Sequence, residues 1–211
     1  MQPASRDAEP RITVVVLAGG DARRLPGKLS LPVGGMPMLA RVCTALSELG
    51  APCIVAARAA LPHEIATRIR VRVIFDEHPG EGPLSALVSA AGAVATPFFF
   101  AAAGDMPGIS ASFVARVIDA AQHAGWPDAT VPMRRDGMAE PLAALYAVTP
   151  WLAAARAALA RGRRNVTAAL DGLRVAHYDV MPEDEPALAN VNTLADYERF
   201  SRVTPAGDGR S

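Results

Sequence analysis

A glycine pair near the amino terminus is followed by three positively charged side chains. The segment LAGGDARRLPGK, residues 17–28, contains the pair Gly19–Gly20 and then Arg23, Arg24 and Lys28. Glycine has no Cβ, so the backbone amides of such a loop can approach a ligand closely, and arginine and lysine pair with phosphate oxygens. The combination indicates a loop that binds the phosphates of a nucleotide. A glycine turn with solvated basic side chains is the alternative.

The loop has neither of two common phosphate-binding patterns. A Walker loop, GxxxxGK[ST], requires a hydroxyl residue after its lysine, whereas Leu29 follows Lys28. The dinucleotide-binding pattern GxGxxG is also absent from the segment. The loop therefore indicates a nucleotide site of another kind.

An aspartate follows the apolar run at 97–103, in the sequence AAAGDMP. Asp105 ends this predicted strand, and Pro107 stops the strand from continuing. Open α/β sheets bind ligands at the carboxyl ends of their strands, so a carboxylate there is suited to hold Mg²⁺ together with phosphate oxygens and water. The alternative is that Asp105 caps the helix expected from Ser110, but it lies five residues too early.

A second aspartate ends another predicted strand and precedes a loop rich in glycine and proline. Asp76 is followed by PGEGPL, residues 79–84, and then by a predicted helix. The amino terminus of a helix attracts anionic or polar groups, so this loop is a candidate pocket for a nucleobase. An ordinary turn is the alternative, because glycine and proline are common in turns. We expect His78 to be a solvated loop residue.

Apolar runs that alternate with segments of helical periodicity predict an α/β fold. The predicted strands are 12–17, 53–57, 71–75, 97–102 and 129–132, and the predicted helices are 37–49, 62–69, 83–94 and 110–124. The first run is continuously apolar and mostly β-branched, which is typical of a strand buried on both faces of a parallel sheet. We therefore expect a three-layer α/β/α sandwich around a Rossmann-like, mainly parallel sheet with right-handed connections.

The alternation is looser beyond residue 133. A strand is predicted at 141–148, an alanine-rich helix at 151–162, a strand at 173–180 and a last helix after NVNT, residues 190–193. No internal repeat or low-complexity linker divides the chain. We predict one domain over residues 11–203, with flexible tails at 1–10 and 204–211.

The composition restricts the class of protein. Lysine plus arginine and aspartate plus glutamate number 21 each in 211 residues, so no overall basic field indicates a nucleic-acid partner. The first ten residues lack the apolar segment of a signal peptide, and the later apolar runs are too short to cross a membrane, so we expect a soluble cytoplasmic protein. Cys43 and Cys53 indicate neither a disulfide framework nor a zinc site, and we expect both to be buried as small apolar residues.

Several motifs occur together along the chain: LAGGxxxR, a following lysine, an aspartate before PGxGPL, then DMP, PLxALY and NVNT. In this order they resemble the molybdenum cofactor guanylyltransferase family, from about Ile12 to Phe200. The resemblance implies a nucleotidyltransferase-type sandwich and Mg²⁺-dependent transfer of GMP from GTP to the terminal phosphate of molybdopterin, with release of pyrophosphate. It also implies molybdenum-insertion or molybdoenzyme maturation proteins as partners.

The resemblance also implies roles for individual residues. Asp105 would bind Mg²⁺ and act in catalysis with Lys28 and Arg23, Asp76 would contact the nucleotide, and Asn190 and Asn192 would line the acceptor side. The remaining residues expected to bind the nucleotide are Leu17, Ala18, Gly19, Gly20, Gly82, Pro83 and Leu84.

The chain departs from the family pattern at two places. Family loops usually read like RMGxDK, whereas this one reads RRLPGK, which is shorter and has Gly27 in place of the aspartate before Lys28. An asparagine usually follows the second strand, whereas the chain has VAAR, residues 55–58. These departures leave two alternatives open: a related enzyme that uses CTP or a sugar or polyol phosphate, and a homologue that binds a nucleotide or cofactor without catalysis.

The expected chemistry is direct attack of the acceptor phosphate on the α-phosphorus of GTP. A phosphate monoester is already ionised near neutral pH, so catalysis can rest on positioning and charge neutralisation. No serine or cysteine has histidine and carboxylate partners recognisable in the sequence, which disfavours acyl transfer through a covalent intermediate.

A pterin that carries a phosphate requires amide and arginine side chains in its pocket. Four further candidates for this side are Arg134, Arg135, Arg163 and Arg164. Arg163 and Arg164 could equally solvate the end of a helix, and the two asparagines of NVNT could cap the last helix. The segment RRDGMAEPL, residues 134–142, is expected to form a mobile loop over the acceptor.

Overall fold

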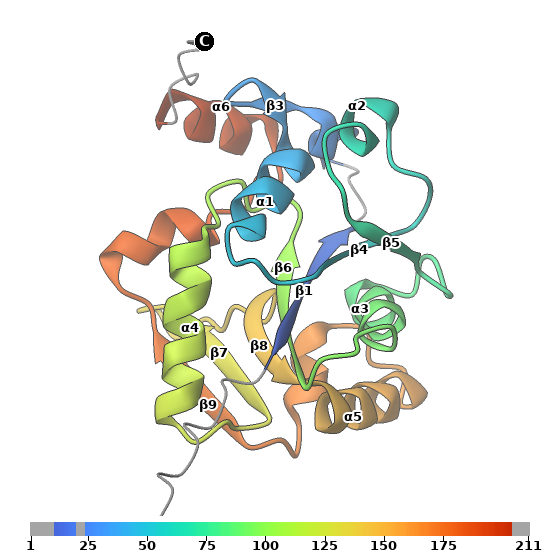
Figure 1. Cartoon of the computed structure of the whole chain (residues 1–211), viewed down its shortest axis with the longest axis vertical. Coiled ribbons are helices and arrows are strands. Elements are labelled where there is room, and N and C mark those ends of the chain that lie inside the picture. The colour runs from blue at the N-terminus through green and yellow to red at the C-terminus, as the bar shows by residue number, and fades with distance from the viewer. Residues whose placement is uncertain (1–10, 20–23, 204–211) are drawn as a thin grey trace, which may run out of the picture.

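The computed structural model describes residues 11–19 and 24–203. Gly20 and Arg23 of the glycine loop, and the two predicted tails, lie outside these residues. The described chain forms one seven-stranded sheet with helices on both faces (Figure 1). Its strand order is β5-β4-β1-β6-β8-β7-β9, and only β8 runs antiparallel to its neighbours. The prediction of a mainly parallel α/β/α sandwich is therefore confirmed.

The strands of the large sheet lie close to the predicted ones. They are β1 (Ile12–Ala18), β4 (Cys53–Ala57), β5 (Arg72–Phe75), β6 (Phe98–Ala103), β7 (Ala129–Met133), β8 (Ala143–Ala147) and β9 (Val175–Asp179). A small hairpin, β2 (Pro32–Val33) with β3 (Met36–Pro37), was not predicted. Two residues per strand are too few to give the alternating pattern by which strands are recognised.

The helices form two layers. One layer contains α1 (Met38–Ser47), α2 (His63–Ala66) and α4 (Ala111–His123), and the other contains α3 (Pro83–Ala91), α5 (Val148–Ala160) and the 3-10 helix η3 (Val166–Leu170). The side chains of Val14 and Val16 join the core under the first layer, and those of Val15 and Leu17 join the core under the second. Successive strand residues point to opposite faces, so a strand covered on both sides is apolar throughout.

Three details differ from the sequence prediction. The helix predicted at 62–69 is a single turn, α2, after which the chain enters the edge strand β5. Helix α5 begins at Val148, directly after β8, so part of the predicted strand is helical. Cys43 is buried as expected, but Cys53 is only half-buried because it begins its strand.

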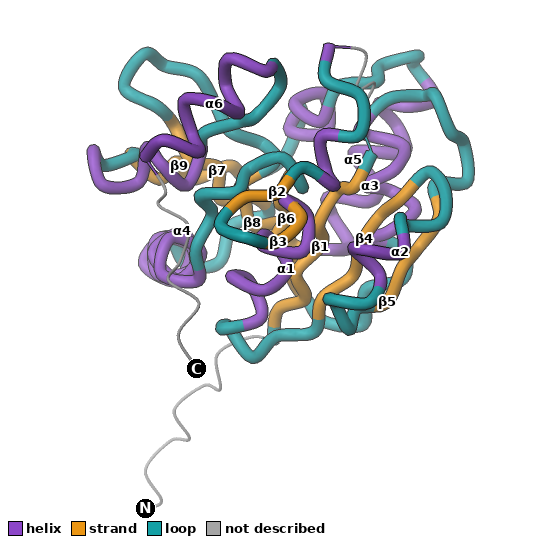
Figure 2. The backbone as a smooth tube through the Cα atoms, turned by 90° about the horizontal axis from the view of Figure 1, so that it is seen from above, coloured by secondary structure: helices purple, strands orange, loops and turns teal. Residues whose placement is uncertain are grey.

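The carboxyl ends of β1 and β6 point toward the end of the molecule where β3 and α6 (Leu194–Val203) lie (Figure 1). There the β2–β3 hairpin lies above the sheet (Figure 2), directly after the short 3-10 helix η2 (Lys28–Ser30) in the chain. A small apolar cluster of Val33, Met38 and Val191, with Tyr197 packed against it, joins the hairpin to the carboxyl-terminal segment. The first and last parts of the chain therefore meet over the ends of the central strands.

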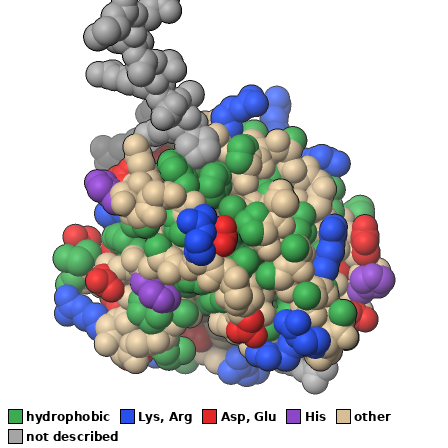
Figure 3. All heavy atoms as spheres, turned by 90° about the horizontal axis from the view of Figure 1, so that it is seen from below, with side chains coloured by type: hydrophobic (Ala, Val, Ile, Leu, Met, Phe, Trp, Pro, Cys, Tyr) green, Lys and Arg blue, Asp and Glu red, His purple; other side chains and the backbone are tan. Residues whose placement is uncertain are grey.

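The surface carries both signs of charge. In Figure 3, basic and acidic side chains are interspersed over the face seen from below. This distribution agrees with the equal totals of basic and acidic residues in the sequence. Among the described residues, no helix combines the length and the apolarity that crossing a membrane requires.

Candidate active site

Lys28 lies at the centre of the carboxyl-terminal edge of the sheet. Its ammonium forms an ion pair with Asp105, which comes from the loop after β6, and donates a 2.8 Å hydrogen bond to Oδ1 of Asn192. The side chains of Lys28 and Asp105 are only 11% and 16% exposed. Gly27, with a φ of 69°, turns the chain into η2 in the left-handed conformation that glycine tolerates best. The structure thus brings together three residues that the sequence analysis placed in separate motifs.

Lys28 is the only lysine in the chain, since the other basic residues are all arginines. An ammonium is a compact charge with three donors, whereas a guanidinium is planar and wider. The narrow position between a carboxylate and an amide oxygen suits the smaller group. Residue type and geometry therefore both suit an ammonium at this position.

Asp105 is held by its backbone on both sides. Gly104 donates a 2.8 Å hydrogen bond to the carbonyl of Leu17, and a Cβ at this glycine would lie 2.9 Å from both that carbonyl oxygen and Cδ1 of Leu39. The carbonyl of Asp105 accepts a 2.9 Å hydrogen bond from the amide of Val191. The carboxylate is therefore fixed between β1 and the segment that carries the asparagines.

Asp105 does not cap the following helix. Ser110 fills that role, because its hydroxyl accepts a 3.2 Å hydrogen bond from the amide of Phe113. The capping alternative for Asp105 is therefore wrong, and its carboxylate is directed to Lys28.

Asn192 does not cap the last helix either. Thr193 and Asp196 form a capping box at the start of this helix. The Thr193 hydroxyl accepts a 3.2 Å hydrogen bond from the Asp196 amide, and the Asp196 carboxylate accepts a 2.9 Å hydrogen bond from the Thr193 amide. The Thr193 hydroxyl and the neighbouring backbone amides hold the pKa of Asp196 below its usual value. The side-chain oxygen of Asn192 accepts instead from Lys28.

A cavity of about 270 Å³ opens beside Lys28. Its lining includes Gly19, Lys28, Arg58 and Asp105. Arg58, at the end of β4, lies against the glycine loop, since a Cβ at Gly19 would be 3.4 Å from its Cγ. Arg58 is not among the site residues predicted from the sequence. Its position directly after a buried strand, next to β1 in the sheet, was the available signal.

Asp76 organises the PGEGPL loop from inside. It is 6% exposed, and its Oδ1 accepts 3.1 Å hydrogen bonds from the Ser85 hydroxyl and from the amide of His78. The other end of the loop contacts the backbone of Arg164, whose carbonyl accepts from the Leu84 amide at 3.3 Å. His78 is exposed, as predicted. The Ser85 hydroxyl thus holds the Asp76 carboxylate in place.

Three of the four arginines considered for the acceptor side have different surroundings, and the fourth, Arg135, is exposed. Arg134 is bound to two glutamates and one carbonyl. Arg163 has Asp171 at 4.0 Å and Arg164 has Glu81 at 3.5 Å. Both are exposed ion pairs, which contribute little to stability. Arg134 therefore differs from Arg163 and Arg164 in having all three sides of its guanidinium occupied.

The described residues contain no group of three or more His, Cys, Asp or Glu side chains placed to hold a metal. Mg²⁺ bound to a nucleotide needs only one or two protein carboxylates, because phosphate oxygens and water complete its octahedron. Asp105, near the end of β6 and beside Lys28, has the chemistry of such a ligand. The donor set therefore fits a magnesium ion carried by a nucleotide better than an ion held by protein alone.

Three comparisons relate the chain to known proteins. Residues 14–175 match the family described as the MobA-like NTP transferase domain. A protein of Mycobacterium marinum described as a probable molybdenum cofactor guanylyltransferase is 33% identical over 188 residues, which cover 86% of this chain and 89% of that protein.

Solved structures share the fold. The crystal structure of molybdopterin-guanine dinucleotide biosynthesis protein A from Archaeoglobus fulgidus has a TM-score of 0.76 and 24% identity, covering 90% of this chain and 97% of that one. A 4-diphosphocytidyl-2C-methyl-D-erythritol synthase from Anaerococcus prevotii has a TM-score of 0.69 at 11% identity, covering 93% and 99%. At these identities the two structures support the fold alone.

Proposed function

The chain belongs to the MobA-like NTP transferase family, and from this premise we propose that it transfers GMP from GTP to the phosphate of molybdopterin. The products are pyrophosphate and molybdopterin guanine dinucleotide. One observation carries the proposal: Lys28, Asp105 and Asn192 converge at the ends of β1 and β6. A cation, a carboxylate and an amide are the groups that a metal–triphosphate and a polar acceptor require.

The strand order supports one orientation of the nucleotide across the ends of the strands. In the order β5-β4-β1-β6, the loops after the strands carry Asp76, Arg58, Gly19 and Asp105 respectively. Phosphates suit the β1–β6 half, where Gly19 and Lys28 line the cavity. The nucleoside then extends over β4 toward β5, where the loop built around Asp76 closes the site.

Lys28 and Asp105 are proposed to separate when the nucleotide arrives. The ammonium and the carboxylate form an ion pair in which their charges neutralise each other. Lys28 would turn to the phosphate oxygens, and Asp105 would hold Mg²⁺, which neutralises phosphate charge and polarises the α-phosphorus when bound. Asn192 would keep the ammonium oriented during this exchange, since its oxygen is already a second acceptor.

The reaction then needs no protein nucleophile. An oxygen of the acceptor phosphate forms a bond to the α-phosphorus of GTP while the bond to the β-phosphate oxygen breaks, and pyrophosphate leaves with the negative charge. The protein contributes by holding the two reactants in line and by placing positive charge where negative charge develops during the reaction. The hydroxyl of Ser85, which is buried, donates to Asp76 and so helps to hold the PGEGPL loop.

Product analysis tests the substrate. The purified chain is incubated with molybdopterin and Mg²⁺ and either GTP or CTP, and the pterin products are identified by mass spectrometry. We expect the guanine dinucleotide and release of pyrophosphate with GTP. A preference for CTP would contradict the assignment of GTP as the substrate. Binding of GTP without formation of any product would favour the non-catalytic alternative.

A further inference from the structure

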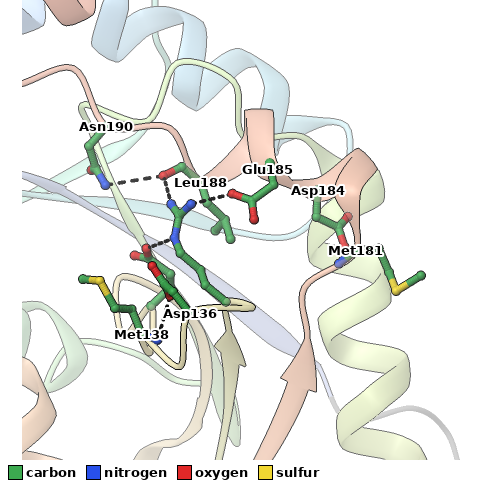
Figure 4. A network of polar contacts seen from close by, with 9 residues as sticks. Asp136, Met138, Met181, Asp184, Glu185, Leu188 and Asn190 are labelled. Carbon is green, nitrogen blue, oxygen red and sulfur yellow. Dashed lines mark hydrogen bonds and ion pairs between the residues drawn. The ribbon is translucent and has the colours of Figure 1, made fainter.

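A tight turn after β7 carries Arg134 toward the segment that leads to Asn190 and Asn192. The Arg134 amide donates to the carbonyl of Met138 at 2.9 Å, and Asp136 accepts from the Met138 amide at 3.0 Å. Gly137 has a φ of 83°, a conformation that favours glycine. Figure 4 shows this turn facing the segment that bears Glu185, Leu188 and Asn190. The segment that was expected to be a loop over the acceptor is therefore joined to that side by hydrogen bonds.

The Arg134 guanidinium uses all of its edges. Nε donates to Glu140 at 2.5 Å, Nη1 to Glu185 at 2.5 Å, and Nη2 to the carbonyl of Leu188 at 2.6 Å. The side chain is 21% exposed. Only the planar fork of an arginine can supply donors in these three directions at once.

The segment that Arg134 contacts leads directly to Lys28. Glu185 and Leu188 belong to the 3-10 helix η4 (Pro182–Leu188), and four residues later Asn192 accepts from Lys28. Between them, Val191 donates to the Asp105 carbonyl at 2.9 Å. The segment 188–192 is thus fixed by Arg134 at its start, by Asp105 near its middle and by Lys28 at its end.

The charges argue against a direct contact between Arg134 and the acceptor. One guanidinium faces two carboxylates, so the cluster of Arg134, Glu140 and Glu185 carries a net negative charge. A phosphate would be repelled by the surplus carboxylate. Arg134 therefore differs from the phosphate-binding arginine that its sequence position suggested.

We propose that Arg134 is a positioning residue for the acceptor, which acts by fixing the segment 188–192 that carries Asn190 and Asn192. The assignment of the acceptor rests on the proposed function above. Loss of the Arg134 hydrogen bonds frees the start of the segment, while the contacts of Lys28 with Asp105 and Asn192 remain. Acceptor binding should therefore suffer more than GTP binding.

A second arginine provides a matched control. Arg116 forms an ion pair with Asp184 near the start of the same 3-10 helix, and Asp184 also accepts from the Tyr178 hydroxyl at 2.6 Å. Asp184 is fully buried, so removing Arg116 breaks a buried interaction of η4 without touching Leu188. Arg116→Ala therefore measures the effect of destabilising η4 in general.

The kinetic test compares Arg134→Ala, Arg134→Lys and Arg116→Ala. For Arg134→Ala we expect the KM for molybdopterin to rise about tenfold or more, because loss of positioning by about 1 Å can cost a hundredfold, while the affinity for GTP stays close to that of the parent. Arg134→Lys should recover only part of the loss. Guanidinium chloride added at millimolar concentration should lower the KM for molybdopterin in Arg134→Ala and in neither of the other two variants. Equal increases in the KM for molybdopterin in Arg134→Ala and Arg116→Ala would overturn the proposal.

A second measurement needs no substrate. Hydrogen exchange at the Val191 amide should be faster in Arg134→Ala than in the parent. In Arg116→Ala the exchange rate should be unchanged. Equal exchange rates in the parent and in Arg134→Ala would refute the proposal that Arg134 fixes the segment. Should Arg134→Ala fail to fold, Arg134→Lys carries both tests. Should the parent protein not use molybdopterin at all, the proposed function is wrong, and the exchange rates alone decide whether Arg134 fixes the segment.

Discussion

The ammonium of Lys28 lies 2.8 Å from Oδ1 of Asn192, a residue 164 positions later in the chain. The same ammonium is paired with Asp105. The first loop, the central strand β6 and the carboxyl-terminal segment therefore meet at one charged group. This convergence makes the site testable residue by residue.

Lys28→Ala should weaken GTP binding roughly tenfold to a hundredfold, because a charge-assisted hydrogen bond contributes about 1.5–3 kcal/mol. Lys28→Arg keeps the charge but adds volume between Asp105 and Asn192, so we expect it to recover only part of the affinity. Isothermal titration with GTP and Mg²⁺ measures both variants. GTP affinity equal to the parent in Lys28→Ala would remove Lys28 from the phosphate site.

Because Lys28 is the only lysine, an amine-reactive reagent can modify only this side chain and the terminal amine. The ion pair with Asp105 and the 11% exposure of the side chain predict slow modification in the free protein. Added GTP with Mg²⁺ should slow modification at Lys28 further and leave the terminal amine unaffected. Peptide mass spectrometry separates the two sites, and equal labelling of Lys28 with and without GTP would argue against contact with the nucleotide.

Asp105→Ala should abolish turnover, because the proposed ligand of Mg²⁺ is lost. The same change releases the ammonium of Lys28 from its carboxylate, so GTP binding measured in EDTA should be equal to or tighter than that of the parent. Pyrophosphate release and titration calorimetry report the two effects separately. Normal turnover in a folded Asp105→Ala protein would reject the metal role.

Gly104→Ala should destabilise the fold and displace Asp105, since the added Cβ would be 2.9 Å from the Leu17 carbonyl oxygen. We expect a loss of about 1–3 kcal/mol in the free energy of unfolding, as in other overpacked sites. Gly92→Ala is the matched control, because Gly92 ends α3 with a φ of −62° and its Cβ would lie at an ordinary 3.4 Å from the nearest atom. Urea denaturation that finds equal stability for the two variants would contradict this account of Gly104.

Asp184 should make the free energy of unfolding depend on pH in the acid range. Burial raises the pKa of its carboxyl, but hydrogen bonds from Tyr178, Arg116 and the Met181 amide outweigh burial and hold the pKa below its usual value. The unfolded chain then binds the proton more readily, so this contribution is present above about pH 5 and is lost as the pH falls below about 4.

The matched variant for this prediction is Asp184→Asn, which cannot ionise. The difference in the free energy of unfolding between parent and variant should be largest near neutral pH and should shrink as the pH falls through the acid range. Urea denaturation at several pH values gives the two curves. Parallel curves would show that Asp184 is not the acid-sensitive group.

The sequence alone predicted much of the fold, and the reasons are local. The run from Ile12 to Leu17 is apolar at every position because both faces of β1 are covered, and such a run has few other interpretations. The extent of α2 and the β2–β3 hairpin were not predictable in the same way. Short elements depend on contacts with distant segments, such as the 2.7 Å hydrogen bond from Tyr197 to the Pro32 carbonyl.

For the candidate site, too, some features could be predicted from the sequence and others depend on the tertiary structure. Residue types and order in the sequence determined which groups take part, because a glycine loop with a lysine and two strand-ending aspartates have a recognisable chemistry. The tertiary structure decided how these groups are used. It directs Asp105 and Asn192 to Lys28, assigns helix capping to Ser110 and Thr193, and occupies Arg134 with two glutamates. These assignments depend on which segments the sheet order and the small apolar clusters bring together, and a side chain's partner across 164 positions is fixed only by that packing.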